Sequence, residues 1–179
     1  MTIRADRRTD AISRMADHLL ATGLVGSSLR PMAAAAGTSD RMLLYYFADK
    51  DDVLASTLGE VARRLADMLE EGAPTPMPFR ELLAVLWSSM RSPTLTPYIS
   101  LWLEVAAASG RGVEPHRRIG GAIADGFLAW TAQRLLVEDE ADRPHLAALL
   151  LSTFDGLAML DAVGRGGEAD AAVAAWVRL

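Results

Sequence analysis

Several side chains between residues 28 and 50 have the types and spacing that suit contact with a phosphate backbone. Ser28 precedes a short apolar helix, whose first amides lack internal partners and whose dipole favours an anion at that end. Lys50, the only lysine in the chain, falls in the first turn of a longer helix, where a cation opposes the helix dipole unless it meets an external anion. Tyr45 and Tyr46 are adjacent, so they point in different directions on a helix and at least one should be exposed. Together these groups favour binding to nucleic acid.

Plainer interpretations of the same residues stay open. Lys50 could be a solvated side chain beside three acidic neighbours, and Tyr45 could be packed in the core. The acidic neighbours, Asp49, Asp51 and Asp52, lack the spacing and the glycine of a calcium-binding loop. They are better suited to the N-cap and first turn of the helix that follows.

Signatures of catalysis or metal binding are missing from the sequence. It contains no cysteine, and its three histidines form no HxxxH or HExxH pair. The glycine-rich stretch at 164–167 lacks the preceding strand and the Lys-Ser/Thr of a phosphate-binding loop. We therefore expect no enzyme, no metal site and no cofactor.

Charge is distributed unevenly along the chain, whose formal net charge is −5. The first 50 residues carry seven basic and five acidic side chains, whereas the remaining 129 carry 11 basic and 18 acidic ones. A mildly basic head on an acidic body fits nucleic-acid contact by the head alone. Hydrophobic residues make up 51% of the chain, enough to bury a core, yet no apolar run approaches the length of a membrane span. We expect a cytoplasmic protein without membrane contact.

Apolar residues recur at helical spacing along the whole chain, and no alternating strand pattern interrupts them. We expect Thr9 or Asp10 to cap the first helix, Thr38 or Ser39 the third and Asp49 the fourth. A proline-rich stretch at 74–78 marks the best candidate for a domain boundary. The predicted helices span about residues 10–22, 29–36, 39–46, 50–71, 79–91, 98–109, 116–136 and 141–163, followed by a last short helix.

The stretch from residue 28 to 54 resembles the helix-turn-helix region of the TetR family of transcriptional regulators. The resemblance covers about the first quarter of the chain. Its residues are a helix that ends at Gly23, the segment Ser28-Leu-Arg-Pro-Met32-Ala33, the turn Ala36-Gly37-Thr38-Ser39, the helix Leu43-Leu44-Tyr45-Tyr46-Phe47 and the opening Lys50-Asp-Asp-Val-Leu54.

The resemblance implies contacts to double-stranded DNA by one set of exposed residues in the head. Four positions depart from the family pattern: Asp40, Arg41, Met42 and Leu44. Asp40 brings a carboxylate that repels phosphate, and Leu44 offers no hydrogen-bond donor. The residues expected to contact DNA are Ser28, Arg30, Ser39, Arg41, Met42, Tyr45, Tyr46 and Lys50.

The C-terminal helices supply many aromatic and thioether side chains, which either fill the core or wall an apolar cavity. Because the helices of a bundle direct their apolar faces inward, we expect these side chains to converge on a site for a small hydrophobic effector. The residues assigned to it are Trp87, Met90, Trp102, Phe127, Trp130 and Phe154.

The segment 146–160 is apolar on more than one side, so its helix needs neighbours on both. By resemblance, this helix and the last one form the interface of a homodimer. The residues assigned to the interface are Leu150, Phe154, Leu157, Asp161 and Trp176.

We therefore expect an all-α protein with an N-terminal three-helix helix-turn-helix DNA-binding domain at residues 1–48. A long connecting helix at 49–73 and an α-helical ligand-binding and dimerisation domain at 74–179 follow. The resemblance implies a repressor that binds a palindromic operator as a homodimer and is released by a small hydrophobic ligand. Two alternatives stay open: a constitutive helical DNA-binding protein without a ligand, and a helical small-molecule-binding protein that has lost DNA binding.

Overall fold

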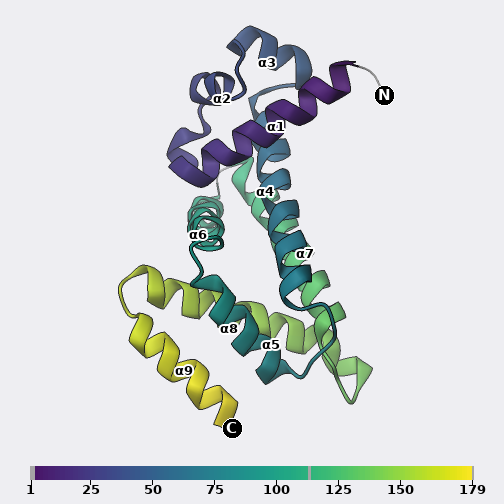
Figure 1. Cartoon of the computed structure of the whole chain (residues 1–179), viewed down its shortest axis with the longest axis vertical. Helices are drawn as coiled ribbons and strands as arrows, with labels where there is room; N and C mark the ends of the chain where they lie inside the picture. Colours follow the sequence, from purple (N-terminus) through teal and green to yellow (C-terminus); the bar gives the residue numbers. More distant parts are fainter. Residues whose placement is uncertain (1–2, 113, 179) are drawn as a thin grey trace. The chain divides into compact units, whose positions relative to one another are not determined.

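The computed structural model describes residues 3–112 and 114–178, and within them the chain is helical, as predicted (Figure 1). An isolated bridge between Met77 and Leu135 is the one strand-like pairing in this part of the chain. In chain order the elements are α1 (Ile3–Thr22), η1 (Leu24–Ser27), α2 (Leu29–Ala35), α3 (Asp40–Tyr46), α4 (Lys50–Gly72), α5 (Phe79–Met90), α6 (Thr96–Gly110), α7 (His116–Arg134), η2 (Glu140–Asp142), α8 (Arg143–Ala162) and α9 (Gly166–Arg178).

Contacts divide the chain into two compact units. Residues 1–64 and 100–121 form the first, and residues 65–99 and 122–179 form the second. Residues 49–64 and 100–121 thus belong to the same compact unit as the predicted DNA-binding segment 1–48.

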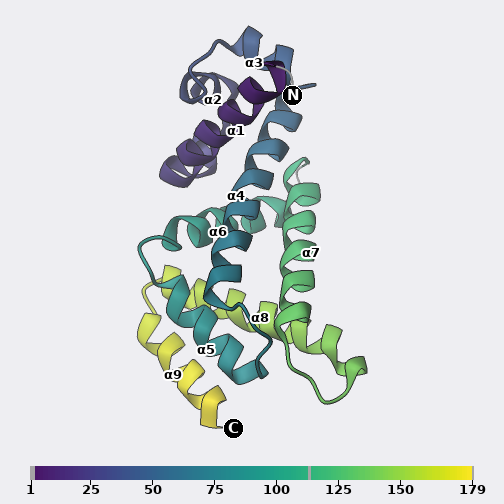
Figure 2. The same ribbon diagram turned by 45° about the vertical axis from the view of Figure 1, so that its right-hand side comes forward.

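The first unit is built around the inner faces of α1 to α4. Figure 2 shows α2 and α3 lying beside α1. The predicted stripe of α1 is buried through Met15 and Leu19, which pack in the same core as Met32 of α2 and Leu43 of α3. Phe47 closes this core, and the Arg8 guanidinium lies over its ring, 4.6 Å from the centroid.

One carboxylate from α6 holds the end of α1. The backbone N–H of Leu24 donates to Oε2 of Glu104 at 2.7 Å. Gly23 adopts φ +69°, a conformation that favours glycine, and a Cβ at this position would collide with the same carboxylate. Both the turn and the approach of Glu104 therefore require a glycine.

The predicted helix limits agree with the structure to within about two residues except at the start of the first helix, and the two 3-10 turns, η1 and η2, were not predicted. Ser39 caps α3 by accepting from the N–H of Met42, and Asp49 caps α4 by accepting from the N–H of Asp52. The expected cap of the first helix at Thr9 or Asp10 is wrong, because α1 already begins at Ile3. Arginine and alanine are good helix formers, which favours helix over residues 4–8.

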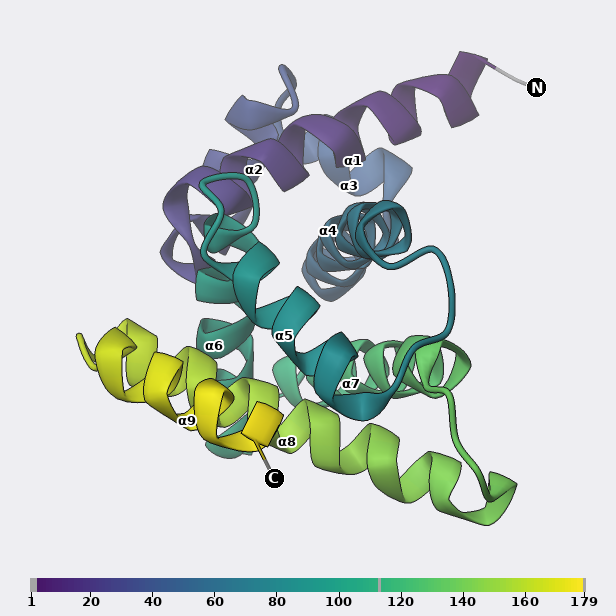
Figure 3. The ribbon, with the colours of Figure 1, turned by 60° about the horizontal axis from the view of Figure 1, so that its bottom comes forward.

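The second unit packs α5 against α8 and α9, which lie side by side in Figure 3. Its core is leucine-rich and includes Leu82, Leu83 and Leu150, all fully buried. The proline-rich segment after α4 is fixed to the end of α7, because Arg134 Nε donates to the carbonyl of Ala73 at 2.8 Å. The segment is therefore an ordered connection within the second unit.

One stretch, Glu140–Ala162, is long and apolar enough to cross a membrane when judged by length and composition alone. Its most apolar window has a mean hydropathy of 1.3, and only 28% of that window is buried. The stretch includes α8, so this helix exposes much apolar surface in the single chain.

Candidate functional site

The turn between α2 and α3 has the geometry of a helix-turn-helix. Gly37 adopts φ +69°, and the N–H groups of Gly37 and Thr38 donate back to the carbonyls of Ala34 and Ala33 at 3.0 and 2.9 Å. These bonds end α2 in a left-handed glycine cap, and Ser39 begins α3 two residues later. The two short helices are therefore joined by a tight, fully hydrogen-bonded turn.

The two faces of α3 differ sharply. Leu43 is completely buried, whereas Tyr45 is 59% exposed and Met42 and Leu44 are each 42% exposed. The Tyr45 and Tyr46 rings meet edge to face, with centroids 5.5 Å apart. Helix α3 thus presents an aromatic and apolar outer surface, flanked by the exposed side chains of Asp40 and Arg41.

The residues assigned to DNA contact are accessible. Seven of them are exposed and Tyr46 is half-buried, so all can reach a partner; the structure places them in the same unit. The seven are Ser28, Arg30, Ser39, Arg41, Met42, Tyr45 and Lys50.

Lys50 is the first residue of α4, and two of its three acidic neighbours, Asp49 and Asp52, have other partners. Asp49 accepts from the N–H of Asp52 at 2.8 Å, and Asp52 accepts from the N–H of Ala48 at 2.9 Å and from the hydroxyl of Ser56 at 3.1 Å. In the described part of the chain Lys50 forms no salt bridge. Its ammonium group is therefore available to an external anion.

The structure adds two cations that the sequence analysis did not assign. Arg7 and Arg14 of α1 line a cavity of about 300 Å³ together with Thr38, Met42 and Tyr46, so they border the outer surface of α3. Arg14 also pairs with Asp10 at 3.1 Å. Their seven-residue spacing puts both on one face of a helix, which was the available signal.

The aromatic residues assigned to the effector form two separate groups in the second unit. Phe127 stacks on Phe154 with centroids 5.8 Å apart and lies 6.0 Å from Trp130. Trp87 donates its indole N–H to Asp170 of α9 at 2.8 Å. This bond and two from Arg91 lower the pKa of Asp170. Met90 is buried nearby on α5, and Trp102 belongs to the first unit.

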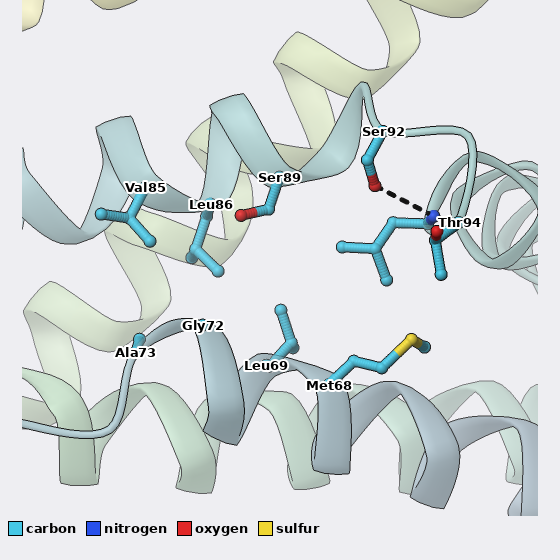
Figure 4. A pocket seen from close by; sticks show the side chains of 10 residues that line it. Met68, Leu69, Gly72, Ala73, Val85, Leu86, Ser89, Ser92 and Thr94 are labelled. Atoms are coloured by element: carbon cyan, nitrogen blue, oxygen red, sulfur yellow. Dashed lines mark hydrogen bonds between the residues drawn. The ribbon is translucent and has the colours of Figure 1, made fainter.

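A cavity of about 260 Å³ lies elsewhere in the second unit, between the end of α4 and α5 (Figure 4). None of the six residues assigned to the effector lines it. The lining residues come from α4, α5 and the loop that follows α5: Met68, Leu69, Gly72, Ala73, Val85, Leu86, Ser89, Ser92, Thr94 and Leu95.

Helix α8 exposes a different side from the one assigned to the dimer. Leu150, Phe154 and Leu157 are 0%, 6% and 3% exposed, because they pack into the core of their own chain. Asp161 lies 3.6 Å from the Arg91 guanidinium, and the Trp176 ring packs on Phe79 with centroids 5.5 Å apart. The first three side chains therefore cannot form a contact surface for a partner.

The exposed apolar side of α8 follows a regular stripe. Its members recur every three or four residues, with Met159 and Leu160 adjacent, so they share one helix face. Among its large apolar side chains Met159 and Val163 are the most exposed, at 55% and 64%. The stripe comprises Leu149, Ser152, Gly156, Met159, Leu160 and Val163.

The fold and the site define an all-helical protein with an exposed helix-turn-helix in its N-terminal unit. Solved structures with this fold include proteins described as TetR-family transcriptional regulators. No family model and no curated protein matches the sequence. A TetR-family regulator from Cytophaga hutchinsonii is 16% identical, with a TM-score of 0.75 over 99% of this chain and 94% of that one.

Two further solved structures with this fold contain bound small molecules. A protein described as a transcriptional regulator from Saccharomonospora viridis, in complex with choline, is 20% identical, with a TM-score of 0.71 over 97% of this chain and 96% of that one. The multidrug binding protein EbrR, complexed with proflavin, is 23% identical, with a TM-score of 0.64 over 95% and 99% of the two chains. At these identities the comparisons establish the fold.

Proposed function

We propose that this chain is a TetR-type transcriptional regulator that inserts α3 into the major groove of a DNA operator. The observation that carries the proposal is the exposure of Arg41 and Tyr45 on the outer surface of α3, together with an exposed Lys50 at the start of α4 that forms no salt bridge within the described residues. A helix of this size fits the major groove, where side chains on its outer face reach base edges. The shared fold with TetR-family regulators supports the same conclusion.

Phosphate contacts would hold α3 in its register. We assign them to Lys50, to Tyr46 and to Ser28, whose helix begins with free amides. Arg7, from the cavity beside Tyr46, adds a cation at the edge of the same surface. These groups offset the carboxylate of Asp40, which repels phosphate.

The exposed stripe of α8 is proposed as the seam of a homodimer. Apolar surface that stays in contact with water costs about 25 cal/mol per Å², so a matching stripe from a second copy would stabilise the pair. Gly156 lies in the stripe, and a Cβ there would meet no atom within 4 Å, so the position leaves room for a close approach by a partner helix. Two-fold pairing implies a palindromic operator whose half-sites are separated by a whole number of helical turns.

Release by a small hydrophobic ligand completes the proposal, with repression as the regulatory outcome. Such a ligand weakens DNA binding only to the extent that it prefers the conformation that does not fit the operator. The choline and proflavin complexes of proteins with this fold support a ligand-responsive role, exercised in the cytoplasm.

The test uses duplexes selected by the protein from a random DNA library, with fluorescence anisotropy measured from 50 to 200 mM salt. We expect Lys50→Ala to weaken binding to every sequence and to reduce the salt slope by about one. Arg80→Ala removes the same charge from an exposed position on α5 and should leave binding unchanged. If Lys50→Ala retains the affinity and slope of the parent protein, the docking surface is wrong.

A further inference from the structure

We propose that the cavity between α4 and α5 binds a small, uncharged, mainly apolar molecule that carries one hydrogen-bonding group. The role of this molecule as the effector rests on the proposed function. Its binding in the cavity does not depend on that function. The aromatic residues assigned to the effector do not line this cavity, and they do not determine the charge of its ligand.

The walls of the cavity are apolar on both sides. Leu86 of α5 and Leu69 of α4 point toward one another across the gap in Figure 4, and Leu95 also lines the cavity. All three side chains are buried. Gly72 and Ala73 end α4 with almost no side-chain volume, and a Cβ at Gly72 would meet no atom within 4 Å. The space therefore exists because the end of α4 is built from small residues.

No charged side chain lines this cavity. Among the charged groups on the flanking elements, Glu70 pairs with Arg134 and accepts from the indole N–H of Trp130, and Arg91 pairs with Asp170. Transfer of an ion into such surroundings without a partner is strongly unfavourable. No aromatic ring is present to receive a cation either, which distinguishes this site from the aromatic cages that bind quaternary ammonium groups.

Ser89 supplies the polar contact. Its side chain is half-buried on the α5 wall, and within the described residues its hydroxyl has no hydrogen-bond partner. Ser92 is different, because its hydroxyl accepts from the N–H of Leu95 at 3.2 Å and is used in the turn (Figure 4). Ser89 can therefore donate to, or accept from, one polar group of a bound molecule.

Volume limits the size of the ligand. A dry apolar cavity of about 150 Å³ accommodates benzene, and this cavity measures about 260 Å³. A two-ring or ten-carbon molecule with a single hydroxyl or carbonyl group fits both the volume and the lining.

The experiment compares two probes of similar shape and different charge by isothermal titration calorimetry with the full chain. 1-Naphthol is neutral at pH 7, whereas 1-naphthylmethylamine is protonated. We expect 1-naphthol to bind and the amine to bind at least tenfold more weakly. The ammonium group would lose its hydration in the cavity, where no charged side chain compensates for it. Equal binding of the two probes, or no binding of 1-naphthol, overturns the proposal.

Matched variants locate the site. Ser89→Leu fills the cavity and should abolish 1-naphthol binding, whereas Ser88→Leu makes the same change on the exposed neighbour and should leave it intact. Ser89→Ala keeps the space and should weaken binding about three- to tenfold through the lost hydrogen bond. Binding by Ser89→Leu as tight as in the parent protein overturns the site, with folding checked by circular dichroism.

The two proposals fail separately. If the parent protein binds 1-naphthol as expected but binds no selected DNA duplex, the result supports the ligand site and refutes the proposed regulatory function. If the parent protein binds DNA with the expected salt dependence but Ser89→Leu does not change 1-naphthol binding, the result supports the proposed regulatory function and refutes the ligand site.

Discussion

Arg64 connects α4 to α1, and its removal should cost much more stability than removal of the adjacent Arg63. The Arg64 guanidinium donates to Asp17 at 2.6 Å, to the hydroxyl and carbonyl of Ser13 at 2.7 and 3.1 Å, and to Glu60 at 2.9 Å. Arg63 also bonds Glu60, but both belong to α4. In this network only Arg64 therefore joins α4 to α1.

The size of each expected stability loss follows from the solvent exposure of the side chains involved. The Arg64 and Glu60 side chains are 21% and 19% exposed, whereas Arg63 is 58% exposed. Charged hydrogen bonds contribute about 1.5–3 kcal/mol each when shielded, and the contributions of one network do not add. We expect Arg64→Met to lower the free energy of unfolding by about 2–4 kcal/mol, which is roughly 5–15 °C in Tm for a chain of this size. Arg63→Met should cost less than about 1 kcal/mol.

Glu60 gives the same network a pH dependence. Hydrogen bonds from Arg63 and then Arg64 lower the pKa of Glu60 from 4.5 to about 2. Because the folded-state pKa lies below the ordinary value, ionised Glu60 stabilises the folded protein above pH 4.5, and this stabilisation is lost as the pH falls toward 2. The stability difference between the parent protein and Glu60→Gln should therefore be constant near neutral pH. It should decrease toward zero as the pH falls from 4.5 to 2.

Urea denaturation followed by circular dichroism measures both effects, at one fixed protein concentration because the proposed dimer would add a concentration-dependent stabilisation. Equal destabilisation by Arg63→Met and Arg64→Met would refute the assignment of the inter-helix contact to Arg64. A Glu60→Gln difference that persists unchanged at pH 2.5 would refute the pH argument.

Two further predictions concern the backbone and the dimer. Gly23→Ala should destabilise the protein by about 2 kcal/mol or more, since it combines a positive φ with the Glu104 carboxylate. Gly59→Ala, mid-helix with no atom within 4 Å, should instead stabilise it by about 0.5–1 kcal/mol in the same urea assay. Met159→Glu places a charge in the exposed stripe of α8, so sedimentation should show a shift from dimer to monomer with an unchanged circular dichroism spectrum; an unaltered dimer would contradict the seam.

The turn and the helix caps within residues 1–50 could be predicted from the sequence because each is determined by neighbouring residues. The glycine turn at Gly37, the Ser39 cap and the Asp49 cap each depend on residues within four positions, so their spacing predicts them. Contacts between distant residues could not be predicted in the same way. Trp87 was assigned to a pocket by its place on an apolar face, but its indole N–H bonds Asp170, 83 residues away.

Helix α8 shows why an apolar helix can be predicted while its orientation cannot. Leu149, Leu150 and Leu151 occupy consecutive positions and so spread over about 200° of the helix circumference. With apolar residues on every side, the sequence pattern has no polar face to mark the solvent, and it cannot distinguish Leu150 from Leu149 as the side chain left for a partner. Packing against α5 and α9 decides the orientation: Leu150 is fully buried and Leu149 is 39% exposed. The same packing leaves Met159 and Val163 in solvent. Exposed apolar side chains in a continuous stripe mark an interaction surface more strongly than buried ones, because only the exposed ones still have burial energy to gain from a partner.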